Sequence, residues 1–349
     1  MARLLHVVRV PRVLMCRQIR CFDLFCGAGG SACGASMAGA QIVGGVDAWK
    51  LAADTFQINF PEAVIWNERA ENIDPKDVAA RVGRVDLLLA SPECTSHSVA
   101  KGNAPRCEIS RETAFQVIRY ARVLQPRWIV VENVPQMMRW SRFCEWLDGI
   151  NRLGYQTCYG VLDAQDYGVP QSRKRLFVVC DMETMPTLPA RFRGPKRTVA
   201  DILGNGEQSD HPWALRPVCP GRLARATLER FQRAVEALGP KSEFLLVYYG
   251  TDGAGGYQSI DRPLRTVTTI DRFSYVRPAG RGHEMRMLQP PELAAAMGFP
   301  PLHQWARSNR RDRIRLIGNA VCPPVMCSVV RHLTGQAVST SATVTLAGH

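Results

Sequence analysis

The sequence lacks several patterns that would assign it to a familiar class. Its 12 cysteines include no CxxC pair and no Cys/His spacing typical of a zinc site. The sequence therefore predicts that the protein has no metal centre. It also predicts a cytoplasmic protein whose cysteines are reduced thiols. Uninterrupted apolar runs of about 18 residues are also missing, which argues against a membrane span. No internal repeat is present.

Acidic residues are in deficit. The chain has 44 Lys and Arg against 31 Asp and Glu, a formal net charge of +13. This excess suits a polyanionic partner, because each phosphate contact by Lys or Arg releases condensed counterions. Charge alone leaves nucleic acid and an anionic membrane surface as alternatives. The 46% hydrophobic content and the length of 349 residues suit a soluble protein with a full-sized core.

Both ends of the chain differ from the middle. Residues 1–20 contain no acidic residue and five arginines, and Pro11 interrupts the apolar core that an export signal would need. We expect residues 1–19 to be a flexible basic arm. Residues 336–349 are rich in Ser, Thr and Ala and predict a flexible tail.

The first half alternates short apolar runs with helical patterns, which is typical of an α/β fold with a mostly parallel, Rossmann-like sheet covered by helices on both faces. The runs that predict strands are residues 21–25, 42–46, 86–90, 128–131 and 176–180. Apolar residues recur at helical spacing over 114–124, with Ser110 as the expected N-cap.

The composition changes in the second half. Over residues 181–282 prolines and glycines interrupt the pattern, and only residues 224–238 show a helical stripe. Regular patterning returns from residue 287. We expect a main domain formed by residues 20–180 and 283–335, with a smaller, irregular domain over 181–282.

A glycine-rich segment, DLFCGAGG at residues 23–30, follows the first predicted strand and opens a helix. Glycines there let the backbone turn sharply and approach a ligand closely. Asp47 ends the next strand, where a carboxylate can accept both ribose hydroxyls. The pair predicts a cofactor that contains adenosine, either a nicotinamide dinucleotide or S-adenosylmethionine. The segment has no GxGxxG spacing, which argues mildly against the dinucleotide.

Two chemically active residues follow other predicted strands. Cys94 lies in a polar loop just past the strand at 86–90, the position where open α/β sheets bind ligands. Glu132 ends the apolar strand at 128–131, and a carboxylate there is costly unless it has a function or a partner. His97 follows Cys94 closely, but no oxyanion pattern accompanies it, so a Cys-His hydrolase is disfavoured.

At these positions the sequence resembles the DNA (cytosine-5) methyltransferase family. The resemblance covers residues 20–180 and 262–333, in the family's order. The motifs that carry it are DLFCGAGG at 23–30, PECT at 92–95 in place of the usual PCQ, ENV at 132–134, QSRKR at 171–175, RPLRTVT at 262–268 and GNAVCPP at 318–324. Each motif is modest alone, whereas six in order are highly specific.

The resemblance implies the chemistry of four residues. Cys94 would be the thiol that adds to carbon 6 of cytosine and so activates carbon 5. Glu132 would hydrogen-bond ring nitrogen 3 and the exocyclic amine. Arg173 would contact the ring carbonyl oxygen, with Arg175 supporting it or a phosphate. Attack perpendicular to the ring cannot occur inside the base stack, so base flipping is implied.

The same resemblance implies S-adenosylmethionine as the cofactor. Trp49 is close enough to Asp47 to stack on adenine, and Asn72 stands where an Asp commonly meets the adenine amine. The residues expected at the cofactor are Asp23, Phe25, Gly27, Gly29, Gly30, Asp47, Trp49, Asn72, Pro92, Asn319 and Val321.

The nucleophile motif departs from the family. Glu93 replaces the usual residue beside Cys94, and a carboxylate facing the thiol would raise its pKa. Our hypothesis is that Glu93 points away and is offset by Arg106 or Arg111. Thr95 in place of Gln is a milder change.

The expected partner is double-stranded DNA, read by a target-recognition domain over 181–282. The expected phosphate contacts are Arg222, Arg225, Arg230, Arg233 and Lys241. The protein would be a cytoplasmic monomer that associates with the nucleoid and not with a membrane. A cognate restriction endonuclease would be its functional partner. The alternatives are an RNA cytosine methyltransferase, an inactive nucleic-acid-binding module and a nicotinamide oxidoreductase, the last of which leaves Cys94 and Glu132 unused.

Overall fold

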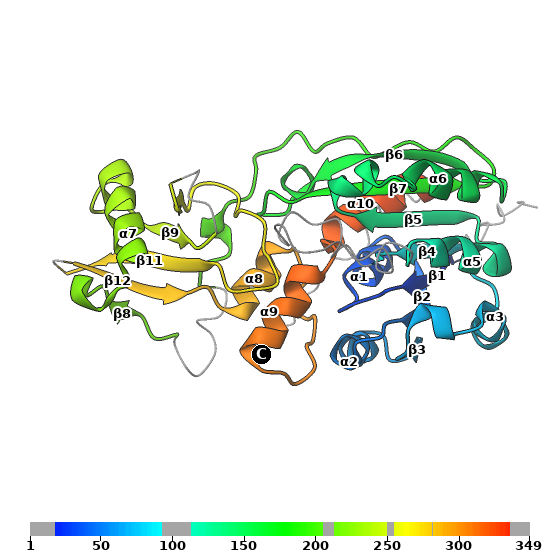
Figure 1. The fold of residues 1–349 in the computed structure, drawn as a ribbon, viewed down its shortest axis with the longest axis horizontal. Coiled ribbons are helices and arrows are strands. Elements are labelled where there is room, and N and C mark those ends of the chain that lie inside the picture. The colour runs from blue at the N-terminus through cyan, green and yellow to red at the C-terminus, as the bar shows by residue number, and fades with distance from the viewer. Residues whose placement is uncertain (1–17, 93–112, 205–212, 250–254, 281, 336–349) are drawn as a thin grey trace, which may run out of the picture.

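The computed structural model of the chain describes residues 18–92, 113–204, 213–249, 255–280 and 282–335. Its larger sheet has seven strands in the order β3-β2-β1-β4-β5-β7-β6 (Figure 1). Strands β1 to β5 pair in parallel, whereas β7 runs antiparallel to β5 and to β6. The strands are β1 (Arg20–Leu24), β2 (Gln41–Val46), β3 (Val64–Trp66), β4 (Leu87–Ala90), β5 (Trp128–Asn133), β6 (Gln156–Asp163) and β7 (Lys174–Asp181).

Helices cover both faces of this sheet, as the alternation in the sequence predicted. Leu87 and Leu89 pack in one apolar cluster with α1 (Gly30–Met37), α2 (Lys50–Asn59) and α10 (Pro323–Thr334). Leu88 and Ala90 pack in a second cluster with α3 (Pro75–Val82), α5 (Phe115–Leu124) and α6 (Phe143–Asn151). Successive residues of a strand point to opposite faces, so an uninterrupted apolar strand supplies both clusters. The predicted fold class is confirmed.

The predicted helix at 114–124 is α5, and Ala114 occupies its N-cap. The expected cap, Ser110, lies outside the described residues. Thr113 and Ala114 are both buried, so the helix begins inside the protein.

The smaller sheet has five antiparallel strands in the order β10-β9-β11-β12-β8. They are β8 (Arg216–Pro217), β9 (Phe244–Val247), β10 (Tyr257–Ser259), β11 (Phe273–Ala279) and β12 (Gly282–Met287). The predicted helix at 224–238 is α7 (Arg225–Leu238), and it packs on this sheet through Phe231 and Ala234.

Strand β12 continues past the domain boundary expected at residue 282. Its last residue, Met287, still pairs with Ser274 of β11. We therefore propose that the smaller domain ends after Met287. The chain then returns to the larger domain through α8 (Pro290–Ala296), α9 (Arg310–Asn319) and α10.

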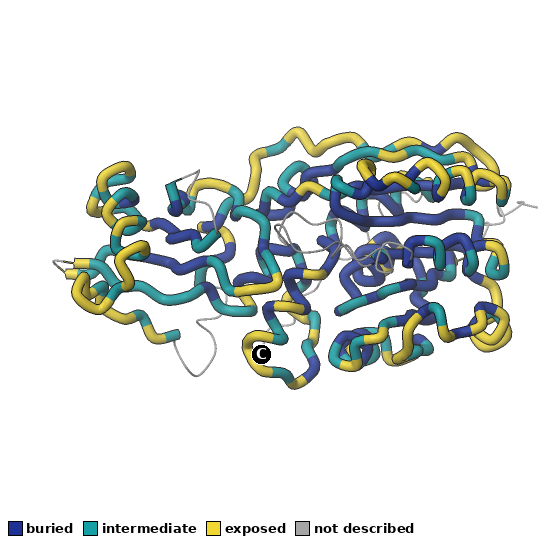
Figure 2. Tube along the Cα trace, in the orientation of Figure 1, coloured by how far each residue is buried: buried dark blue, intermediate teal, exposed yellow. Residues whose placement is uncertain are grey.

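The two sheets are joined by a continuous core. Leu245 and Phe273 of the smaller sheet belong to the same apolar cluster as Val130 of the larger one. Figure 1 shows α8 and α9 between the sheets, and Figure 2 shows the buried strands on both sides. The helical stretch over residues 310–334 has the length and composition of a membrane span, but most of its apolar part is buried within the protein, as in a core helix.

Candidate active site

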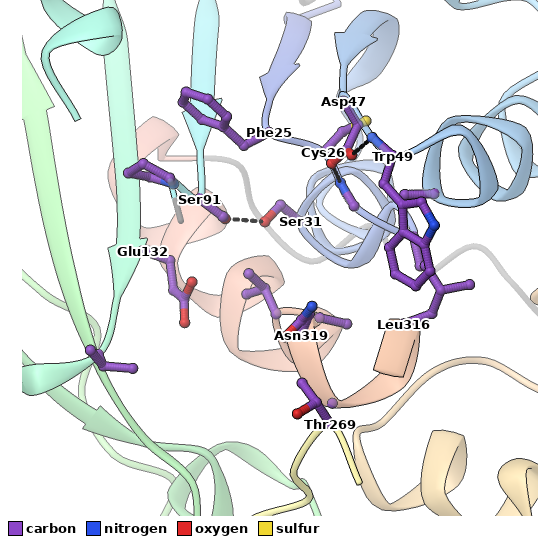
Figure 3. Close-up of a pocket in the computed structure, with 18 of the residues that line it drawn as sticks. Phe25, Cys26, Ser31, Asp47, Trp49, Ser91, Glu132, Thr269, Leu316 and Asn319 are labelled. Carbon is purple, nitrogen blue, oxygen red and sulfur yellow. Dashed lines mark hydrogen bonds between the residues drawn. The ribbon is translucent and has the colours of Figure 1, made fainter. Parts of the chain in front are cut away.

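A cavity of about 1010 Å³ opens at the carboxyl ends of the parallel strands. Phe25, Asp47 and Ser91 follow β1, β2 and β4, and Glu132 lies near the end of β5; all four line the cavity. Residues 266–269, 315–316 and 318–321 line it from the other side. Figure 3 shows Glu132 near one end and Trp49 near the other, with Ser31 and Asn319 between them. Ligands bind at this edge of open α/β sheets.

The glycine-rich loop turns between β1 and α1 through a left-handed backbone. Phe25, Gly27 and Gly29 have φ values of 61°, 53° and 81°. A Cβ built on Gly27 would meet no protein atom within 4 Å, so its backbone faces the open cavity. The loop can therefore come close to a ligand there.

Asp47 holds this loop in place. Its Oδ2 accepts from the backbone N–H of Gly27 at 2.8 Å, and its Oδ1 accepts from that of Trp49 at 2.8 Å. Asp47 also lines the cavity, where the expected ribose contact would be made. Its carboxylate thus shapes the loop in addition to any contact with a ligand.

Three expected cofactor residues lie behind the cavity instead of on its wall. A Cβ on Gly29 would lie 3.0 Å from the ring of Phe60, and one on Gly30 would lie 2.4 Å from the carbonyl oxygen of Val321. Asp23 is fully buried and accepts from the backbone N–H of Ala32 at 3.1 Å. These residues support the loop from behind, because they let α1 pack closely against Phe60 and the backbone of Val321.

Burial raises the pKa of Asp23 to about 8, with a further contribution from the charge of Asp47. An unfolded Asp ionises near pH 4, so between about pH 4 and 8 the folded chain holds a proton that the unfolded chain has lost. Stability should therefore fall as the pH rises through this window.

The Asp23→Asn variant keeps an acceptor oxygen for the N–H of Ala32. We expect it to remove this pH-dependent loss of stability, which is on the order of a few kcal/mol. Denaturant unfolding at about pH 5 and about pH 8 measures it. The control is the exposed Asp77→Asn variant, on α3, in which the free energy of unfolding should change with pH as it does in the wild type. The same change in the free energy of unfolding between the two pH values in Asp23→Asn and in the wild type would contradict the prediction.

Glu132 and Arg175 form a partly buried ion pair at the other end of the cavity. Arg175 Nε lies 3.1 Å from Glu132 Oε1, and the Glu132 side chain is 9% exposed. Burial raises the pKa of Glu132, and the charges of Arg175 and Arg173 oppose that rise. The site therefore places a carboxyl with a raised pKa beside a guanidinium.

Arg173 is buried and its guanidinium donates to backbone carbonyls. Its Nη1 donates to Val267 at 2.9 Å, and its Nη2 donates to Gly318 at 2.8 Å and to Ala320 at 3.2 Å. Arg173 lines the cavity, and these bonds tie its guanidinium to protein; its expected contact to the ring carbonyl oxygen stays a prediction. Of the two arginines, Arg175 is the one paired with Glu132.

The QSRKR segment at 171–175 is hydrogen-bonded to the motif at 262–268. Gln171 donates from Nε2 to the carbonyl of Ala296 at 3.0 Å and accepts at Oε1 from the N–H of Val267 at 2.8 Å. The backbone N–H of Ser172 donates to the carbonyl of Leu264 at 2.8 Å. Sequence segments far apart in the chain thus form one wall of the cavity.

The described residues on either side of the expected nucleophile lie at the cavity. Pro92 and Thr113 both line it, and Asn133 donates from Nδ2 to the carbonyl of Pro92 at 3.1 Å. Cys94 lies outside the described residues. So do Glu93 and its two expected arginine partners, and so does His97.

The end of the cavity near β3 differs from expectation. Asn72 is exposed and is not among the residues that line the cavity; its Nδ2 donates to Glu68 Oε1 at 2.9 Å. Glu68 does line the cavity. It follows β3, a short strand that the sequence patterns did not reveal, and its position past a strand end is the signal that could have found it.

Trp49 lines the cavity with one face engaged by Arg315, whose guanidinium carbon is 4.6 Å from the ring centroid. Sequence reasoning missed Arg315, which comes from α9. Asn319 and Val321 both line the cavity, as expected from the last motif. Near Trp49 the wall is apolar, with Ala52 and Leu316 in one cluster.

A mostly parallel sheet with a glycine loop after its first strand and a cavity at the strand ends defines the class of open α/β proteins, whose ligands bind at the carboxyl ends of the strands. The model of the C-5 cytosine-specific DNA methylase family matches residues 19–335. The chain belongs to this family.

Similar proteins include restriction-modification methylases. The chain is 28% identical over 200 residues to type II methyltransferase M.HindV of Haemophilus influenzae, which covers 54% of this chain and 62% of that protein. It is 26% identical over 334 residues to type II methylase M.HgiDII of Herpetosiphon aurantiacus, covering 86% and 90%. The match to M.DdeI of Desulfomicrobium norvegicum spans 39% of that relative.

Solved structures with the same fold include the Entamoeba histolytica methyltransferase EhMeth, with a TM-score of 0.67, 16% identity and coverage of 91% of this chain and 98% of that one. A DNMT2 variant from Spodoptera frugiperda gives a TM-score of 0.65, 16% identity and coverage of 91% and 100%. These likenesses establish the fold.

Proposed function

We propose that the chain is a DNA (cytosine-5-)-methyltransferase, EC 2.1.1.37. It would transfer a methyl group from S-adenosylmethionine to carbon 5 of a flipped-out cytosine in a specific double-stranded DNA sequence, through a covalent Cys94 adduct. The observation that carries the proposal is that one cavity is lined by the Asp47 loop at one end and by the Glu132–Arg175 pair at the other.

The residues of the loop end fit an adenosine cofactor. Gly27 offers open space where any side chain would intrude, and Asp47 supplies acceptor oxygens beside it. Ala52 and Leu316 add an apolar surface for a base. When bound, S-adenosylmethionine supplies an electrophilic methyl group; the chain's own residues bind and orient it.

The Glu132 end fits a cytosine ring. Because burial raises the pKa of Glu132, this carboxyl can hold a proton for ring nitrogen 3 while its other oxygen accepts from the exocyclic amine. We now assign the contact to the ring carbonyl oxygen to Arg175, since Arg173 is committed to three backbone carbonyls.

The nucleophile is assigned to Cys94 from its motif. Its Sγ would form a bond to carbon 6, which makes carbon 5 nucleophilic toward the methyl group. Loss of the carbon-5 proton and cleavage of the Sγ–carbon-6 bond then release methylated base and free thiol. In support, the described residue two positions before Cys94, Pro92, lies on the cavity wall and is held by Asn133.

The partner would be duplex DNA, read by the smaller domain, which we place at residues 181–287. The net charge of +13 supports a polyanionic partner. Some of the expected phosphate contacts are already engaged: Arg225 pairs with Glu229 at 2.9 Å, and Arg233 donates to the carbonyl of Gly255 at 3.2 Å. Arg222 and Lys241 are exposed and are the better candidates.

The relatives named type II methyltransferases support a cognate restriction endonuclease as a further partner. We also propose that the protein works as a monomer in the cytoplasm, associated with the nucleoid.

Incubation with tritiated S-adenosylmethionine and either duplex DNA or transfer RNA tests the function. We expect label in DNA, at carbon 5 of cytosine, and bisulfite sequencing of DNA from expressing cells should identify the target sequence. Label in RNA and not in DNA would assign the chain to the RNA-directed alternative. Label in neither, with DNA still bound, would favour the inactive binding module.

A further inference from the structure

A short basic segment lies between the two sheets in the chain, after β7 and before the 3-10 turn Val199–Asp201. Residues 191–197, RFRGPKR, contain four cations and no acidic residue. We call this segment the basic strap, and its four cations, Arg191, Arg193, Lys196 and Arg197, are all exposed. Figure 1 shows this part of the chain passing along the top of the view, from the larger sheet toward the smaller one. The strap therefore presents a concentrated positive charge between the two sheets.

One acidic residue anchors the strap beside the larger sheet. Asp166 lies in the 3-10 turn Ala164–Tyr167, which follows β6. Its carboxylate oxygens lie 3.3 Å from Lys196 Nζ and 3.7 Å from Arg191 Nε. Its carbonyl oxygen accepts from the backbone N–H of Phe192 at 2.8 Å. The strap is therefore fixed on this turn before any ligand binds, and two of its cations are used to hold it there.

The segments that hold the two ends of the strap also form part of the cavity wall. At the first end, the backbone N–H of Ala164 donates to the carbonyl of Arg173 at 3.0 Å, so the turn lies against the QSRKR segment. Just after the second end, the N–H of Val199 donates to the carbonyl of Arg262 at 3.0 Å. Arg262 begins the motif whose residues 266–268 line the cavity, as Arg173 also does. The strap therefore crosses from one part of the cavity wall to another.

Arg193 and Arg197 are the cations that this anchoring does not use. Neither has an ion-pair or hydrogen-bond partner among the residues that the structure describes. Lys174, which is exposed and lines the cavity, is likewise unpaired within the described part of the chain. Exposed cations without a carboxylate partner attract a polyanion, and the planar guanidinium of arginine matches a phosphate with two parallel hydrogen bonds. The strap and the cavity rim therefore favour a phosphate backbone that runs past the cavity.

We propose that the strap binds the phosphate backbone of duplex DNA beside the base that enters the cavity, through Arg193 and Arg197. The assignment rests on the proposed function, because a cytosine at Glu132 places its own backbone at the mouth of the cavity. Phosphate contacts fix the register of a protein on DNA and add affinity, but they carry no sequence information. The strap thus positions the duplex, in addition to the contacts proposed for Arg222 and Lys241.

Two pairs of arginines give a matched comparison. The strap variant, Arg193→Gln with Arg197→Gln, removes two charges from the strap. The control variant, Arg122→Gln with Arg152→Gln, removes two charges from exposed residues at the ends of α5 and α6. These helices end just before β5 and β6 begin, so the control charges lie at the amino edge of the sheet, opposite the cavity. A lysine variant, Arg193→Lys with Arg197→Lys, keeps the charge of the strap.

Fluorescence anisotropy with a labelled DNA duplex of random sequence, at salt concentrations from about 50 to about 200 mM, tests the proposal without requiring turnover. Each lost phosphate contact should lower the slope of log affinity against log salt concentration by about 1. We therefore expect the slope to fall by about 2 in the strap variant, with affinity about tenfold or more weaker at the lowest salt. The control and lysine variants should keep the wild-type slope. Denaturant unfolding should give wild-type stability for all of them, because the replaced side chains are exposed.

An unchanged slope in the strap variant, or an equal fall in the strap and control variants, would overturn the assignment while leaving DNA as the partner. The same fall in the lysine variant would also overturn it, because a lysine neutralises a phosphate as an arginine does. Failure of the wild type to bind the duplex would overturn the proposed partner, and the role of the strap with it. The failure of the strap and the failure of the proposed function are therefore distinguishable.

Discussion

Replacing Cys94 with Ala should abolish methyl transfer while cofactor and DNA binding persist. Without the thiol, carbon 6 has no nucleophile and carbon 5 remains too weak to accept the methyl group. We expect a loss of about 10³-fold or more, since removing the nucleophile of other covalent enzymes costs up to about 10⁶-fold. Transfer of tritium to duplex DNA measures the rate, and calorimetry with S-adenosylhomocysteine measures cofactor binding.

The control is Cys144→Ala, which removes an exposed thiol on α6. It should transfer methyl groups at the wild-type rate. Duplex DNA that carries 5-fluorocytosine adds a direct readout, because the fluorine cannot leave as a proton does and the adduct persists. We expect a denaturation-resistant complex with the wild type and Cys144→Ala. Such a complex with Cys94→Ala, or its retained turnover, would contradict the covalent mechanism.

The parts of the site that the sequence predicted are those that follow apolar strands. Phe25, Asp47 and Glu132 could be placed because β1, β2 and β5 are buried on both faces and have mainly apolar sequences. Their carboxyl ends meet at one edge of the sheet, so the sequence order already implied a shared cavity. The wall residues Asn319 and Val321 followed from the family resemblance.

The remainder depends on tertiary contacts that leave no local pattern. Glu68 follows β3, which is apolar but has only three residues, Val64–Trp66, too few to predict a strand from the sequence. The smaller sheet is similar, because β8 has two residues and β10 has three. Gly29 and Gly30 lie in the predicted motif, yet their role is to let Phe60 and the backbone of Val321 approach.

The two arginines of the QSRKR segment show the same limit on sequence reasoning. Arg173 lies just before β7 and Arg175 is its second residue; residues two apart on a strand point to the same face, so the spacing does not say which arginine meets the substrate. The carbonyls that accept from Arg173 come from Val267, Gly318 and Ala320, which are distant in sequence. Only the folded chain assigns one arginine to the wall and the other to Glu132.

Substitution of these two arginines should therefore have opposite consequences. Arg173→Ala removes a buried cation from three backbone carbonyls, so we expect the free energy of unfolding to fall by about 3 kcal/mol or more. Arg175→Ala removes a partner that Glu132 can replace by taking up a proton, so stability should change little. Its turnover should fall by about 10²- to 10³-fold, as when an enzyme loses one donor to a developing charge.

Denaturant unfolding and single-turnover methyl transfer, measured on both variants, separate the roles. Arg173→Lys serves as a milder variant, since a lysine keeps the charge but cannot reproduce the planar fork that spans three carbonyls. It should lose stability and, once folded, transfer at close to the wild-type rate. A stable but inactive Arg173 variant beside an active Arg175→Ala would contradict this assignment of the two arginines and return the ring contact to Arg173.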